Sequence, residues 1–164
     1  MSEEPDPVEW TREHWALTGQ PQPDAFAAMA ALLRSHQKTV AALEDELKEF
    51  ELTLTGYLLL TTLLMSRATT RPLGQLSRHL MIHPTTVTLL IDQLERRGLV
   101  QRSPHVSDRR IVLAKLTPAG RRLTIKANKA TAAVNFGLGG LSHAETLGLV
   151  DTLRQIRGKL GDPV

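Results

Sequence analysis

Apolar side chains recur along residues 26–50 with the spacing of a long amphipathic helix. Steps of three and four residues alternate without a break through Phe26, Met29, Leu33, His36, Val40, Leu43, Leu47 and Phe50. This heptad pattern predicts a helix of about 25 residues, which is roughly 38 Å long. One small lobe cannot cover a stripe of that length, so we expect much of it to contact a partner subunit.

After residue 50 the sequence predicts three shorter helices. Thr53 is a suitable N-cap for a Leu-rich core helix over residues 56–66. A helix over 72–80 and another from Pro84 to about residue 97 meet at a tight junction, and Gly98 is a natural stop for the second. Two short helices joined in this way are typical of a helix-turn-helix.

Alternating polarity follows directly after Gly98. Residues 99–103 and 110–116 alternate as two strands would, with a turn over 104–108 between them. Thr117-Pro118 starts a further helix, and Ser142 with Glu145 forms a capping box at the start of the last one. The sequence therefore predicts a mainly α fold with a small two-stranded β wing, and a possible extra helix over 7–17.

Charge is distributed unevenly along the chain. The formal net charge is +3, but it is −7 over residues 1–66, +8 over 67–122 and +2 over 123–164. The cations therefore lie on the segment that carries the helix-turn-helix and the wing. This coincidence indicates a surface that binds phosphates rather than a merely solvated basic face.

Composition excludes several classes of function. The chain has no cysteine, so disulfides, thiolate nucleophiles and cysteine zinc sites are excluded. None of the G-x-S-x-G, H-E-x-x-H or phosphate-loop motifs occurs, and His79 and His83 straddle a helix junction. We expect no enzymatic activity, no metal and no cofactor. The acidic N-terminus and the short apolar runs predict a cytoplasmic protein without a membrane span.

Several polar side chains lie where a DNA-binding helix and wing would present them. A recognition helix placed in the major groove reads base edges from its first turns. Other polar and basic side chains nearby could contact phosphates, which position the protein without specifying sequence. The candidates for the two kinds of contact are Thr85, Thr86, Thr88, His83, Arg71, Arg78, Arg102 and Arg109. For the threonines, ordinary helix-start chemistry remains an equal alternative.

Motifs over residues 24–160 resemble the MarR family of bacterial winged helix-turn-helix regulators. They are Leu52-Thr53, Gln75-Leu76-Ser77, Thr85-Thr86-Val87-Thr88, Leu94-Glu95-Arg96-Arg97-Gly98-Leu99-Val100, Ser107-Asp108-Arg109-Arg110 and Leu116-Thr117-Pro118-Ala119-Gly120. Many members carry Arg directly after the position of Thr88, whereas this chain has Leu89, so one polar contact is absent.

The resemblance implies a homodimer that binds double-stranded DNA. It implies a helical dimerisation region over 24–51 and 118–164 and a DNA-binding lobe over 52–117. The composition of residues 1–23 indicates instead an acidic tail with a possible short helix. The resemblance also implies that Arg110 enters the minor groove, and we expect Asp108 to hold the Arg110 guanidinium by a charge-assisted bond.

Further residues are expected at the subunit interface and at an effector pocket. The interface residues are Phe26, Met29, Leu33, His36, Val40, Leu147, Val150 and Leu153. Trp10, Trp15 and Tyr57 could line a pocket for a small aromatic or anionic effector, although such residues are more often core. The favoured function is a ligand-responsive repressor acting on a pseudo-palindromic operator. The alternative is a winged-helix module that docks another protein.

Overall fold

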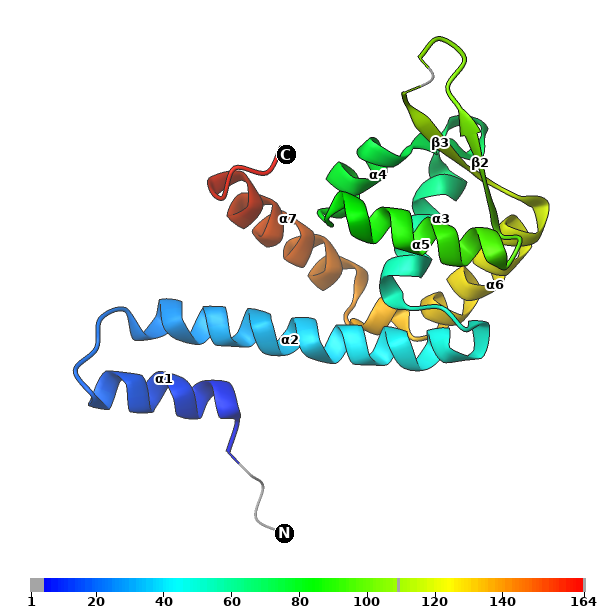
Figure 1. Ribbon diagram of the computed structural model, residues 1–164. Coiled ribbons are helices and arrows are strands. Elements are labelled where there is room, and N and C mark those ends of the chain that lie inside the picture. Colours follow the sequence, from blue (N-terminus) through cyan, green and yellow to red (C-terminus); the bar gives the residue numbers. More distant parts are fainter. Residues whose placement is uncertain (1–4, 109, 164) are drawn as a thin grey trace.

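The computed structural model describes residues 5–108 and 110–163, and its elements follow the predicted order (Figure 1). The helices are α1 (Pro7–Leu17), α2 (Pro23–Leu47), α3 (Leu54–Met65), α4 (Leu73–Leu80), α5 (Pro84–Arg96), α6 (Pro118–Ala133) and α7 (His143–Lys159). Short 3-10 turns follow three of them: η1 (Lys48–Phe50), η2 (Arg67–Thr69) and η3 (Asn135–Gly137). The strands are β1 (Thr70–Pro72), β2 (Val100–Pro104) and β3 (Val112–Leu116).

Local capping chemistry sets the helix starts, as the sequence predicts. The Thr53 hydroxyl accepts the Gly56 backbone N–H at 3.1 Å at the start of α3. At the start of α7, the Glu145 carboxylate accepts the Ser142 backbone N–H at 2.8 Å, and the Ser142 hydroxyl accepts the Glu145 N–H at 3.3 Å. These side chains satisfy backbone donors that have no partner inside a helix.

The wing is the predicted antiparallel hairpin, but it belongs to a three-stranded sheet in the order β1-β3-β2. Val100 pairs with Leu116 and Pro104 with Val112. The third strand, β1, was not expected beside the two-stranded wing, and it moves the start of α4 from Pro72 to Leu73. Three residues are too few to show a period of two, and Pro72 is tolerated because β1 lies at the sheet edge.

The hydrophobic core lies inside the helix-turn-helix lobe and is built around α3. Leu59, Leu60 and Leu63 of α3 have no exposed surface, and they form one cluster with residues of α4, α5, the sheet and α6. Gly120 brings the start of α6 against the first residue of the wing. A Cβ there would lie 2.1 Å from the Leu99 carbonyl oxygen, so only glycine fits.

The remaining helices form an extended arm, which we define as α1, α2 and α7. Trp15 of α1 stacks on Phe26 of α2 with ring centroids 3.8 Å apart, and both helices project from the lobe (Figure 1). In α1 and α7, which are described from end to end, no residue is buried. Within the described residues, no helix is both long and apolar enough to cross a bilayer.

Candidate nucleic-acid interface

Helix α5 has one buried side and one exposed side, and the exposed side includes residues of its first turn. Val87, Ile91 and Leu94 are buried against the core. Thr85 and Thr86 are exposed, together with Thr88 one turn further on. These threonines thus lie in the first turns of a helix whose opposite side is fixed in the lobe, which is the arrangement a recognition helix requires.

Hydrogen bonds at the start of α5 restrict what its polar groups can offer. His83 is the N-cap, and its Nδ1 accepts the Thr85 backbone N–H at 3.3 Å. In the neutral ring the proton therefore lies on Nε2, which can donate to a phosphate oxygen or a base acceptor. The Thr88 hydroxyl donates to the Pro84 carbonyl at 3.1 Å, so it presents its lone pairs and methyl group outward.

Leu89 lies on the side of α5 that faces away from the core. At 100° per residue its direction falls between those of Thr85 and Gln93 and opposite the buried residues. The side chain is 57% exposed. Helix α5 therefore presents an apolar group directly after Thr88, at the position where the family resemblance leads us to expect an arginine.

The tip of the wing is held by two hydrogen bonds from backbone N–H groups to Asp108. The Asp108 carboxylate accepts the Arg110 backbone N–H at 2.9 Å, and the Asp108 carbonyl accepts the Ile111 N–H at 3.0 Å. This corrects the expected bond from Asp108 to the Arg110 guanidinium: the carboxylate orders the turn, and the Arg110 side chain stays exposed. Arg109 lies outside the described residues.

Two of the predicted basic residues meet at one hollow beside the wing. Arg78 of α4 and Arg110 line a hollow of about 430 Å³, together with Gln75. Gln75 also accepts a hydrogen bond from the Arg71 Nε at 3.4 Å. The structure therefore brings Arg71, Arg78 and Arg110 together along one edge of the lobe, where α4 meets the sheet.

Arg102 occupies a different environment from the one expected. Its guanidinium pairs with the carboxylates of Asp92 and Glu95, the latter at 3.0 Å, and donates to the Thr88 carbonyl at 3.1 Å. Instead of an open phosphate-binding side chain, Arg102 is a bridge between the wing and α5. The two acids lie seven and ten residues away, so helix spacing alone does not reveal the contact.

The predicted interface residues divide into exposed and covered positions. Met29, Leu33 and His36 of α2 are exposed, as are Leu147 and Val150 of α7. Phe26, Val40 and Leu153 are partly covered within the chain. Met29 and Leu33 on α2 and Leu147 and Val150 on α7, which we call the apolar strip, are thus left partly uncovered by the described residues of the same chain.

The three aromatic residues expected at an effector pocket do not come together. Trp10 and Trp15 line a hollow of about 560 Å³ on α1. Tyr57 is 5% exposed inside the lobe, and its hydroxyl hydrogen-bonds to that of Thr131 at 3.0 Å. Tyr57 is therefore a core residue, which corrects the expectation of one pocket shared by all three.

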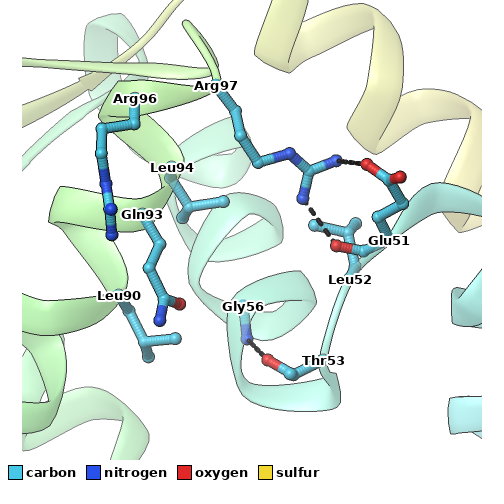
Figure 2. A pocket seen from close by; sticks show the side chains of 9 residues that line it. All are labelled: Glu51, Leu52, Thr53, Gly56, Leu90, Gln93, Leu94, Arg96 and Arg97. Atoms are coloured by element: carbon cyan, nitrogen blue, oxygen red, sulfur yellow. Dashed lines mark hydrogen bonds and ion pairs between the residues drawn. The ribbon is translucent and has the colours of Figure 1, made fainter.

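Sequence reasoning did not single out the hollow between α5 and the start of α3 (Figure 2). It measures about 440 Å³ and is lined by Leu52, Leu90 and Leu94, with Arg96 and Arg97 at its rim. Figure 2 shows Arg97 reaching across to Glu51. No local pattern could have predicted this contact, because 46 residues separate the two partners.

Comparison with known proteins agrees with this geometry. Residues 52–112 match the MarR family. An uncharacterized HTH-type transcriptional regulator of Bacillus subtilis (strain 168), YhbI, is 36% identical over 103 residues, which cover 63% of this chain and 66% of that protein.

Solved structures extend the match to the arm. Sco5413, a MarR family transcriptional regulator from Streptomyces coelicolor, is 30% identical with a TM-score of 0.77, covering 85% of this chain and 99% of that one. BpsR of Bordetella bronchiseptica is 29% identical with a TM-score of 0.70, covering 77% of this chain and 90% of that one. The chain therefore belongs to the MarR family of DNA-binding transcriptional regulators.

Proposed function

We propose that two copies of this chain bind a pseudo-palindromic operator in double-stranded DNA and repress transcription. Residues 52–117 form the DNA-binding lobe, and residues 24–51 and 118–164 form the dimerisation region. The first turns of α5 enter the major groove, and Arg110 enters the adjacent minor groove. The observation that carries this proposal is the exposure of Thr85, Thr86 and Thr88 on the lobe that also holds Arg71, Arg78 and Arg110.

Affinity and specificity come from different parts of this surface. We expect Arg71, Arg78 and the His83 Nε2 to contact phosphates, so binding should weaken steeply as salt concentration rises. The threonines and Leu89 face the bases. Because hydroxyl lone pairs accept from base amino groups and apolar groups contact the thymine methyl, we expect Thr88 and Leu89 to favour specific base pairs.

The exposed apolar strip supports the homodimer. Met29 and Leu33 on α2 and Leu147 and Val150 on α7 are each roughly half exposed. Neighbouring large apolar side chains that a single chain leaves exposed are typical of a protein interface. A two-fold dimer presents its recognition helices to half-sites about one helical turn apart.

We propose further that a small aromatic or anionic molecule releases the dimer from DNA. The support is the relative BpsR, whose DNA binding is regulated by 6-hydroxynicotinic acid. A ligand that changes the distance between two recognition helices mismatches the half-sites, and each lost base contact costs about 1–3 kcal/mol.

Selection of random duplex DNA by the purified protein tests the proposal. We expect a palindrome with half-sites about one turn apart. Arg110→Ala should bind it about tenfold or more weakly, because a minor-groove contact is lost. Arg122→Ala removes the same charge from an exposed position on α6 and should bind nearly as the wild type does.

Two outcomes would contradict the proposal. Enrichment of no sequence, with binding that disappears as salt rises, would leave only a generic phosphate surface and would favour the protein-docking alternative. Equal losses of DNA affinity in Arg110→Ala and Arg122→Ala would show that Arg110 makes no specific contact with the minor groove. Aromatic carboxylates, including 6-hydroxynicotinic acid, are then added to the selected complex, and failure of the whole panel to release it would contradict the ligand response.

A further inference from the structure

Arg97 connects the recognition helix to the joint between α2 and α3, which we call the elbow (residues 48–53). It is the C-cap residue of α5. Its Nη1 donates to the Glu51 carbonyl at 2.6 Å, its Nη2 donates to the Phe50 carbonyl at 2.9 Å, and the Glu51 carboxylate lies 3.5 Å from Nη2. Figure 2 shows the guanidinium extended from the end of α5 to Glu51.

The elbow depends on Arg97 for part of its hydrogen bonding. Glu51 adopts a left-handed backbone with φ of +53°, which is uncommon outside glycine and ends the helical path of α2 and η1. The last carbonyls of a helix lack partners within it. Arg97 supplies donors to two of them, and its positive charge lies at the favourable end of the helix dipole.

The hollow beside this contact leaves room between the two elements. About 440 Å³ of space separates the elbow from the side of α5 that carries Leu90 and Gln93. Leu52 of the elbow and Leu94 of α5 join the same core beside this hollow, but Leu90 and Gln93 border open space, so the packing between the elbow and α5 is incomplete along that stretch. The Arg97 fork is a directional tether at the end of the gap, and its side chain is only 33% exposed.

We propose that Arg97 is a positioning residue that sets the angle of the recognition helix relative to α2. This inference rests on the proposed homodimer. Because α2 carries part of the subunit interface, the angle between α5 and α2 determines how far apart the two recognition helices lie. Arg97 thus selects the half-site spacing that the dimer accepts, and it does so without touching DNA.

Arg96 provides a matched control at the same end of α5. It is exposed, and its Nε donates to the Asp92 carbonyl of its own helix at 3.3 Å. Arg96→Ala and Arg97→Ala remove the same charge from neighbouring positions, but only the second removes the tether. Arg97→Lys keeps the charge but loses the planar guanidinium, so it should retain only part of the effect of the tether.

The experiment measures affinity for a series of duplexes built from the selected half-site. The series holds a single half-site, the selected spacing, and spacings longer or shorter by one and two base pairs. We expect Arg97→Ala to bind the selected spacing about fivefold or more weakly. It should lose the preference among spacings, and it should bind the single half-site as the wild type does. Arg97→Lys should fall between these two proteins, and Arg96→Ala should keep the wild-type preference.

Two results would overturn the inference. A loss for the single half-site and for every spacing alike, with a smaller salt slope, would make Arg97 a phosphate contact. An unchanged spacing preference in Arg97→Ala would show that no tether operates. If Arg97→Ala does not fold, Arg97→Gln, which cannot reach both carbonyls, is measured in its place. A wild-type protein that is monomeric or has no preferred spacing would instead contradict the proposed homodimer.

Discussion

The DNA-binding lobe and the helical arm bury their apolar residues to very different degrees. In the lobe, α3 alone has four leucine and tyrosine side chains at 5% exposure or less, and the sheet and α5 complete the same core. In the arm, α1 and α7 bury none of their residues. The lobe is thus packed within one chain, whereas the arm keeps apolar surface that a single chain leaves uncovered.

This difference separates two kinds of stability. Burial within a chain contributes to folding at any protein concentration, whereas burial between chains depends on concentration. We therefore expect substitutions in the lobe to change the free energy of unfolding and substitutions on the arm to change the dimer dissociation constant first.

The largest expected effect comes from Leu33→Glu on the arm. A carboxylate placed in an apolar interface would lose its hydration without gaining a partner, so the dimer should dissociate. Loss of two-site binding should weaken operator binding about 100-fold or more. Analytical ultracentrifugation and DNA titration measure the two effects. Leu58→Glu, at an exposed position on α3 in the lobe, is the control, and a dimeric Leu33→Glu protein would show that the strip is not the interface.

Substitutions at two glycines should change the free energy of unfolding in opposite directions, and both effects should be smaller than that of Leu33→Glu. Gly120→Ala forces a methyl group against the Leu99 carbonyl and should lower the free energy of unfolding by about 3 kcal/mol. A Cβ at Gly148 in α7 would meet no described residue within 4 Å apart from the adjoining turns of its own helix, and alanine is the better helix former by about 1 kcal/mol. Chemical denaturation at fixed protein concentration measures both. A destabilising Gly148→Ala would mean that the partner subunit packs closely there.

The smallest expected effect concerns pH and the start of α7. The Ser142 hydroxyl, followed by its backbone N–H, holds the pKa of Glu145 below its ordinary value. The stabilisation is therefore complete above the ordinary glutamate pKa and is lost as the pH falls through the lowered one. NMR titration of the Glu145 carboxyl should show this lowered midpoint, and Ser142→Ala should raise it. An unchanged midpoint in Ser142→Ala would contradict the capping box.

Those parts of the fold that depend on local chemistry were predictable from the sequence. Thr53 and the Ser142–Glu145 pair mark helix starts with side chains that satisfy backbone donors nearby, and Pro84 marks one because it lacks an N–H and its φ already suits a helix. The structure confirms each of these helix starts. Strand β1 was not predictable, because its three residues become a strand only through pairing with β3.

The residues of the candidate site also divide into those whose environment follows from local sequence and those whose environment depends on contacts elsewhere in the fold. Exposure of the three threonines follows from helix periodicity, so sequence alone placed them outside the buried side of α5. The environments of Arg97, Arg102 and Tyr57 depend on contacts between distant segments, of 46 residues for Arg97 and 74 for Tyr57. A guanidinium or a phenol has the same appearance in sequence whether it faces solvent or a neighbouring helix.

The approach of η3 to α2 has a consequence for how such regulators diversify. Gly137 has a φ of +74°, and a Cβ there would lie 2.9 Å from the Thr39 carbonyl, while the Thr39 hydroxyl donates to the Gly137 carbonyl at 3.3 Å. The chain leaves this crossing through residues 138–142 and enters α7. In the proposed dimer, insertions or deletions in that short connection would redirect α7 while leaving the lobe intact. Descendants of one gene could then stop forming mixed dimers yet keep the same DNA sequence preference.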